Sequence, residues 1–258
     1  MRARFLTAAV GIPVVIAALY FGGPVFFIFM ALFSLGAMFE FARMLGFSQS
    51  LSAVVGGTIV IPYYLNLHFH FCPWDAYLLL YIIIATSILF VFCFEKYSFQ
   101  QSCGLIFGGI YITFLASTLA MLRNMENGLL LTLAVFLVTW GTDSGAYFIG
   151  MLLGKRKFAP AISPKKSWAG ALGGLITGII IATAIGIFSK GNVLQFFLWG
   201  CSAAIFGQIG DLCESALKRF TGVKDSGKIF PGHGGFLDRI DSLLFVSALA
   251  YIFFVVFA

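Results

Sequence analysis

Charged residues are scarce in this sequence. Asp, Glu, Lys and Arg together make up 10% of the 258 residues, and only ten residues are acids. Hydrophobic residues make up 60% of the chain, whereas a soluble domain of this size is about half apolar. The period-two alternation that a membrane β-barrel requires is also absent. Apolar runs of about 17 to 25 residues, each long enough to cross a bilayer as a helix, predict an all-α polytopic integral membrane protein.

Motifs of several other protein classes are missing as well. The sequence contains no nucleotide P-loop, no glycine-rich dinucleotide fingerprint and no nucleophile elbow, so it offers no support for the enzyme classes that use them. The five Cys are scattered without the paired spacing of a metal site. We expect them to be reduced packing residues, and we expect no nucleic-acid partner.

The apolar runs predict about nine transmembrane helices, at residues 5–21, 24–45, 51–67, 76–94, 103–122, 129–153, 169–188, 193–220 and 241–257. Basic residues set the orientation, because cytoplasmic loops carry an excess of Lys and Arg. With the N-terminus inside and the C-terminus outside, only Arg123 and Lys190 of the sixteen Lys and Arg fall outside. The sequence therefore predicts an N-in, C-out protein of the cell inner (plasma) membrane whose first apolar run is retained rather than cleaved.

The N-terminal half, residues 1–126, offers few candidates for chemistry, and we predict a structural, lipid-facing transmembrane region. Glu40 and Arg43 are three residues apart and are expected to pair with each other. Two His and one Cys at 68–72 suggest a metal site, but a fourth ligand is missing. A loop with interfacial aromatic residues is therefore the favoured interpretation of that segment.

The C-terminal half, residues 127–258, is predicted to be the catalytic transmembrane region, with cytoplasmic loops at 154–168 and 221–240. Asp143 falls inside an expected span, where an acid is functional by default; pairing with a neighbouring cation is the alternative. Small residues recur every four positions from Gly170 onward. This spacing predicts a helix packing face rather than a ligand groove.

The stretch from Asp211 to Asp241 concentrates the charge of the chain: it holds five of the ten acids and five of the sixteen Lys and Arg. Helical spacing places Asp211 and Glu214 on one face with Lys218. A glycine-rich loop follows, and Asp238 and Asp241 then begin the last apolar segment, where the helix dipole favours carboxylates. Carboxylates for Mg²⁺, cations for phosphates and a glycine loop predict phosphoryl or nucleotidyl transfer. A loop that is basic only for topology is the alternative.

The segment also resembles a known family signature. The 27 residues SALKRFTGVKDSGKIFPGHGGFLDRID, 215–241, look like the signature of phosphatidate cytidylyltransferases, also called CDP-diacylglycerol synthases. The stretch SPKKSWAG at 163–170 is similar to a second motif of that family, although Ala169 takes the place of the usual Glu. The motif of the CDP-alcohol phosphotransferases is missing, which favours a synthase of CDP-lipid over an enzyme that consumes it.

The resemblance implies transfer of CMP from CTP to phosphatidic acid, giving CDP-diacylglycerol and pyrophosphate with Mg²⁺ as cofactor. Asp211 and Asp238 are the main predicted metal ligands, Asp241 and Glu214 support them, and the number of ions is left open. The predicted catalytic residues are Asp211, Asp238, Lys218 and Asp241. The predicted substrate-binding residues are Asp143, Ser163, Lys165, Lys166, Ser215, Arg219, Lys224, Asp225, Lys228, His233 and Arg239. Arg239 could instead pair with Asp211 or Asp241. His233 could instead have a structural role.

The implied partners are CTP, phosphatidic acid, membrane lipids and a second copy of the chain in a homodimer, with the active site at the cytoplasmic side. Two rival functions remain. One is a membrane transporter or lipid-binding protein whose acids relay ions. The other keeps the enzyme class and changes the lipid, as in a CDP-ether-lipid synthase or a polyprenol kinase.

Overall fold

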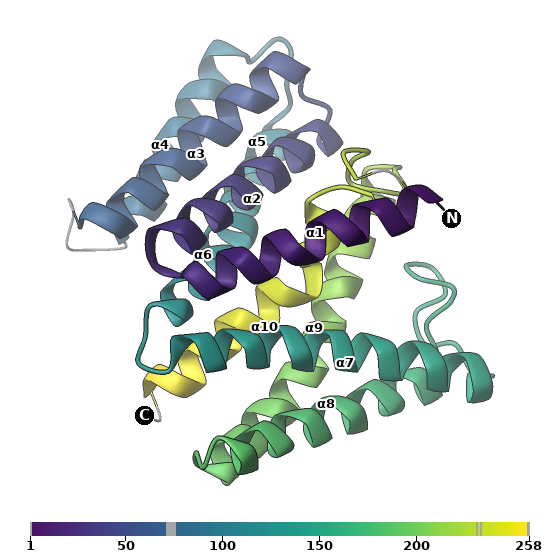
Figure 1. Cartoon of the computed structure of the whole chain (residues 1–258). Coiled ribbons are helices and arrows are strands. Elements are labelled where there is room, and N and C mark those ends of the chain that lie inside the picture. Colours follow the sequence, from purple (N-terminus) through teal and green to yellow (C-terminus); the bar gives the residue numbers. More distant parts are fainter. Residues whose placement is uncertain (1, 71–75, 231, 233, 257–258) are drawn as a thin grey trace.

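The computed structural model describes residues 2–70, 76–230, 232 and 234–256. The described chain is helical, apart from its loops and two isolated bridges within them. Figure 1 shows the helices α1 Arg2–Phe21, α2 Gly23–Met44, α3 Gln49–Phe69, α4 Ala76–Phe92, α5 Phe99–Gly108, α6 Leu115–Arg123, α7 Gly128–Leu153, α8 Trp168–Phe188, α9 Val193–Phe220 and α10 Leu237–Val256. A π-helical turn, η1 Gly109–Phe114, joins α5 to α6. The all-α prediction is confirmed.

Polar residues begin several of these helices. Ser48, Ser98, Ser167 and Asn192 each accept a hydrogen bond from the backbone amide three residues ahead. Such caps satisfy amides that have no partner inside the helix. Polar residues in the connections therefore help to fix where these four helices start.

The helices form two groups that meet at α10. In Figure 1, α7, α8 and α9 lie on one side and α2 to α5 on the other, with α10 between them. The last helix contacts α9, α6, α7 and α2. The hydrophobic core includes Phe41 and Met38 of α2 and Trp199 of α9, all almost fully buried. Residues from both halves of the sequence thus share one apolar core.

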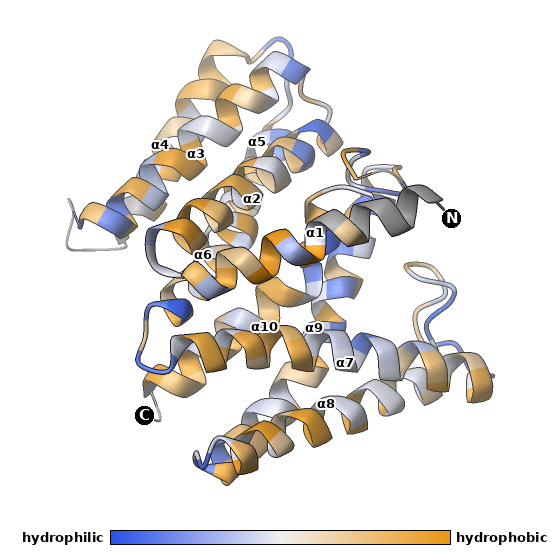
Figure 2. Ribbon diagram, in the orientation of Figure 1, coloured by the Kyte–Doolittle hydropathy of each residue, from blue (hydrophilic) through white to orange (hydrophobic). Residues whose placement is uncertain are grey.

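Six helical segments of the described chain are long and apolar enough to cross a membrane: Gly23–Met44, Gln49–Phe69, Phe99–Arg123, Gly128–Leu153, Trp168–Phe188 and Val193–Phe220. Each coincides with a predicted span. The other three predicted spans also fall on helices, α1, α4 and α10, but these are not among the six. In Figure 2 much of the helical ribbon has the colours of apolar residues, and hydrophilic residues lie mainly in loops and near helix ends. A multi-pass membrane protein fits this pattern.

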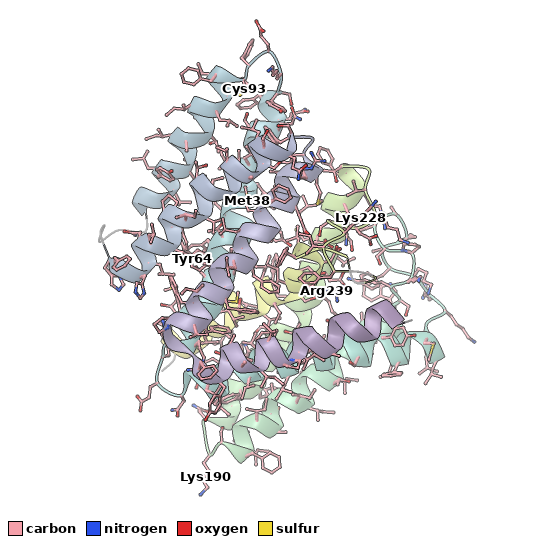
Figure 3. All side chains as sticks on the ribbon, turned by 45° about the horizontal axis from the view of Figure 1, so that its top comes forward. Met38, Tyr64, Cys93, Lys190, Lys228 and Arg239 are labelled. Carbon is pink, nitrogen blue, oxygen red and sulfur yellow. The ribbon has the colours of Figure 1, made fainter. Side chains whose placement is uncertain are left out.

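The polar connections that carry the predicted site lie at one end of the molecule. The start of α1 and the loops 154–167 and 221–236 are on the same side, and the C-terminal end of α10 is on the other (Figure 1). In Figure 3, Lys190 lies at the bottom of the view, and Lys228 and Arg239 lie above it. The second loop is four residues shorter than predicted, because α10 begins at Leu237, so Asp238 and Asp241 are both helical.

The small residues of α8 form a packing face, as predicted. Gly170, Gly174, Gly178, Ala182 and Gly186 are all buried. A Cβ atom at Gly174 would lie only 2.8 Å from the carbonyl oxygen of Thr142 on α7. The α7 and α8 backbones therefore approach as closely as glycine permits, which is how small residues join membrane helices.

Gly174→Ala should destabilise the protein by about 1 to 3 kcal/mol, because the added methyl group overpacks the α7–α8 contact. Gly57→Ala on α3 is the matched control, since its nearest neighbour would be the Ile61 Cδ1 atom at 3.8 Å. That change should be neutral or gain up to about 1 kcal/mol of helix propensity. Thermal unfolding of the detergent-solubilised variants checks both, and equal effects at the two glycines would contradict the close approach.

Candidate active site

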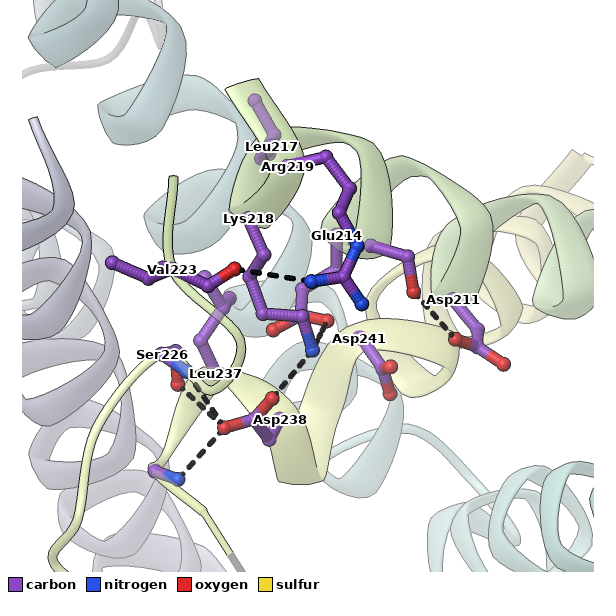
Figure 4. A network of polar contacts seen from close by, with 12 residues as sticks. Asp211, Glu214, Leu217, Lys218, Arg219, Val223, Ser226, Leu237, Asp238 and Asp241 are labelled. Atoms are coloured by element: carbon purple, nitrogen blue, oxygen red, sulfur yellow. Dashed lines mark hydrogen bonds and ion pairs between the residues drawn. The ribbon is translucent and has the colours of Figure 1, made fainter. Parts of the chain in front are cut away.

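Lys218 connects the end of α9 to the start of α10. Its ammonium group forms an ion pair with Glu214, one turn earlier on α9, and a second with Asp238 Oδ1 on α10 at 2.6 Å. The Glu214 and Lys218 side chains are 0% and 12% exposed, and that of Asp238 is 8% exposed. Figure 4 shows this group of three charges between the two helices. Buried charges of this kind are stable only when paired, so the cluster fixes the helix ends relative to each other.

Asp238 also holds the loop 221–236. Its Oδ2 atom accepts hydrogen bonds from the Ser226 amide at 2.9 Å and from the Gly235 amide at 2.8 Å, and the Ser226 hydroxyl oxygen lies 2.9 Å away. Burial alone would raise the pKa of the Asp238 carboxyl, but the Gly235 amide and Lys218 reverse the effect and lower it to about 2. Asp238 is therefore an ionised carboxylate with both oxygens engaged.

A second set of acids lies beside this cluster. Asp211 Oδ2 pairs with Lys166 Nζ at 2.9 Å, and Asp211 Oδ1 accepts a longer hydrogen bond of 3.4 Å from Ser215. Asp241 interacts electrostatically with Asp211, with Asp143 on α7 and with Lys218. In Figure 4 its carboxylate lies between Asp211 and the Lys218 cluster. Three helices thus direct acids toward one region.

The approach of α9 to α10 sets the spacing of these acids. A Cβ atom at Gly210 would lie 2.7 Å from the Asp241 carbonyl oxygen. The absence of a side chain there allows the two backbones to touch directly beside Asp211. The close approach of the two backbones therefore keeps the Asp211 and Asp241 positions near each other.

The acid set has the chemistry that Mg²⁺ requires. Carboxylate oxygens are its preferred protein ligands, and at nucleotide sites one or two carboxylates suffice because substrate phosphates and water complete the shell. In the described residues no three Asp, Glu, His or Cys form a ready metal cluster. Asp211 of α9 and Asp241 of α10 fit the two-carboxylate pattern. Asp211 is paired with Lys166 in this structure, and Glu214 and Asp238 are both paired with Lys218.

The loop 154–167 closes one side of a cleft of about 540 Å³. Asp143 and Asp211 line it, together with Lys165 and Lys166. The loop is attached to α9 by the Lys166–Asp211 ion pair and by a 3.3 Å hydrogen bond from Arg219 to the Ile162 carbonyl. The cleft therefore combines acids from α7 and α9 with cations from the loop.

The remaining predicted residues occupy the periphery. Lys224, Asp225, Lys228 and Arg239 are exposed. Arg239 interacts electrostatically with Asp143, and the ion pairs of the described residues include none from it to an acid. Ser163 is half-buried in the loop 154–167, and His233 lies outside the described residues.

Comparison with known proteins identifies the family. Residues 2–257 match the family model described as "Cytidylyltransferase family". The chain belongs to this family. The phosphatidate cytidylyltransferase of Staphylococcus aureus (strain COL) is 36% identical to it over 260 residues, 96% of this chain and 97% of the relative. That of Bacillus subtilis (strain 168) is 33% identical over 266 residues, 100% and 99% of the two chains. That of Staphylococcus haemolyticus (strain JCSC1435) is 34% identical, over 96% and 97%.

In this member of the cytidylyltransferase family, Glu40 of α2 contacts the signature segment, although the sequence predicted that it pairs with Arg43. The predicted Glu40–Arg43 pair is wrong: Arg43 donates to the Phe47 carbonyl at 3.2 Å, while Glu40 accepts from Ser226 and from the Leu237 amide. The only sequence signal was an acid inside an apolar helix, which is costly unless it has a specific partner. That partner lies 186 residues away along the chain.

Asp238→Asn should lower the free energy of unfolding by roughly 2 kcal/mol near neutral pH. This is the free energy that corresponds to a carboxyl pKa falling from 3.8 to about 2 on folding. The ionised form stabilises the folded state, so the contribution is complete above the ordinary pKa and is lost as pH falls through the lowered one. Denaturant unfolding should show a constant difference between wild type and variant above about pH 5 that shrinks between about pH 4 and 2. A difference that does not change with pH would contradict this role.

Proposed function

We propose that this chain is a phosphatidate cytidylyltransferase, which transfers CMP from CTP to phosphatidic acid and releases pyrophosphate. The full-length similarity to curated enzymes of that name is the observation that carries the proposal. The arrangement of the site supports it, because the charged residues of the signature are gathered at one end of an apolar helical molecule. An enzyme that joins a water-soluble nucleotide to a membrane lipid needs such a location.

The reaction requires two anions to meet. A phosphate oxygen of the lipid attacks the α-phosphorus of CTP, the bond to the β-phosphate oxygen breaks, and pyrophosphate leaves with its electron pair. The attacking oxygen is already ionised near neutral pH, so no strong general base is needed. Cations must instead reduce the repulsion, and we assign this role to Lys218 at the centre and Lys165 and Lys166 at the cleft. Arg219, Lys224 and Lys228 bind phosphates at the rim.

We propose Mg²⁺ as the cofactor, held first by Asp211 and Asp241. When bound, it supplies charge neutralisation of the triphosphate and of the leaving pyrophosphate. Asp238 can bind such an ion only when its ion pair with Lys218 is broken. Lys218 would then keep its ion pair with Glu214 on the same helix. Asp143 borders the same cleft and would interact with the ion through a water molecule or through the bound substrate.

The membrane setting follows from charge and hydropathy. We propose nine spans in the inner membrane with the N-terminus and the site on the cytoplasmic side, since both basic loops lie at the end where the chain starts. This side is where CTP is available. A homodimer is part of the proposal through the family resemblance.

Purified protein should convert labelled CTP and phosphatidic acid into CDP-diacylglycerol, with activity lost on chelation by EDTA and restored by Mg²⁺. Asp211→Asn should lower turnover by at least about 100-fold, because one of two metal carboxylates is gone. Thin-layer chromatography of the lipid product measures both. Product with an ether lipid or a polyprenyl acceptor but not with phosphatidate would change the substrate, and no transfer to any acceptor would favour a transporter.

Lys224→Ala should raise the KM for one substrate by about 5- to 50-fold with little change in kcat, because an exposed phosphate contact contributes roughly 1 to 2 kcal/mol of binding. Lys96→Ala removes an equally exposed cation from the connection between α4 and α5 and serves as control. Steady-state kinetics with each substrate varied separately gives the result. Unchanged kinetics at Lys224 would assign it to membrane topology.

A further inference from the structure

Glu40 is a buried acid in the half of the chain that carries no signature motif. It lies in α2, a membrane-spanning candidate, and is 3% exposed. Within the described chain no Lys or Arg forms an ion pair with it. A carboxylate buried without a cation is costly unless hydrogen bonds satisfy it. Its partners therefore indicate what it does.

Its partners all belong to the signature segment. Glu40 Oε2 accepts a 2.8 Å hydrogen bond from the Ser226 hydroxyl and a 3.1 Å bond from the Leu237 amide. Leu237 is the first residue of α10, and the first amides of a helix have no partner within it. Glu40 thus caps α10 from another helix.

The loop is shaped to accommodate this carboxylate. A Cβ atom at Gly227 or at Gly235 would collide with the Glu40 carboxyl group. Nearby, the Phe236 ring packs edge-on against Phe33 of α2, with ring centroids 5.0 Å apart. Two glycines and an aromatic contact therefore dock the loop on the α2 face that presents Glu40.

The contact is relayed to the reaction centre through Ser226. Its hydroxyl lies 2.8 Å from Glu40 Oε2 and 2.9 Å from Asp238 Oδ2, and its amide also donates to Asp238. Asp238 in turn holds Lys218. A displacement of Glu40 would move Ser226 and the start of α10, and with them the orientation of Asp238.

We propose that Glu40 is a positioning residue for the transfer reaction: it fixes the loop 221–236 and the first turn of α10, so that Asp238 and Lys218 keep their relative orientation. The inference rests on the proposed function for its kinetic consequence and on the contacts alone for its structural one. It assigns a role in the reaction centre to a helix from the N-terminal half.

Glu40→Ala should lower kcat by about 100-fold, since a displacement of about 1 Å at a reaction centre has effects of that size, with the KM for CTP changed less than about 3-fold. Glu40→Gln retains an oxygen that can accept from Leu237 and should lose about 10-fold or less. Hydrogen exchange of peptides covering 226–240 should accelerate in Glu40→Ala. Ser34→Ala is the control, because Ser34 is buried on the same helix but bonds to Tyr64; it should leave both measurements unchanged.

Wild-type kcat with wild-type exchange in Glu40→Ala would overturn the proposal, and so would equal losses in Glu40→Ala and Ser34→Ala. If Glu40→Ala does not fold, Glu40→Asp, whose shorter side chain withdraws the carboxyl group from Ser226, forms a cycle with Ser226→Ala and the double variant. The losses in kcat should then be less than multiplicative, because both changes remove the same contact; multiplicative losses would overturn it. An inactive wild-type protein would remove the proposed function, whereas the exchange measurement would still test Glu40.

Discussion

The ion-pair cluster of Lys218 with Glu214 and Asp238 is the interaction on which the site depends. In an apolar helical protein, an isolated charge at this depth would be prohibitively costly. Lys218 pairs with both acids, and the amides of Ser226 and Gly235 donate hydrogen bonds to Asp238. The arrangement is stable only if α9, α10 and the loop between them keep their positions. The charges of this cluster are therefore compensated only when the loop 221–236 keeps its conformation.

This constraint connects the two halves of the chain. The predicted division placed chemistry after residue 127 and left the first half as scaffold. The contacts of α2 with α10, and of Glu40 with Ser226 and Leu237, show that the first half contributes polar as well as apolar packing. The two halves are therefore not independent: the loop that carries the signature is folded against a helix from the other end of the sequence.

Local patterns predicted much of this structure. Apolar run length placed a helix at every expected span, and four-residue spacing of small side chains predicted the α8 packing face. Helical spacing also put Asp211, Glu214 and Lys218 on one face, and the Glu214–Lys218 pair follows from it.

Long-range contacts were beyond such patterns. Periodicity says which residues share a face of one helix, but it says nothing of which helix that face meets. For this reason the sequence could not reveal that Asp238 would be engaged by Lys218 and the loop, that Asp241 would lie between the acids, or that Glu40 would bond to residues almost two hundred positions away. The early start of α10 has the same origin, since Leu237 is capped from α2.

The backbone contact at Gly210 has a consequence for ion affinity. Like charges on flexible side chains relax by moving apart, but Asp211 and Asp241 are anchored to helices that touch beside them. The packing of α9 against α10 therefore keeps the two acids near each other, and Lys166 compensates the charge of Asp211. A cation that binds there is attracted by both carboxylates and reduces the repulsion between them, so the contact between the two helices favours cation binding.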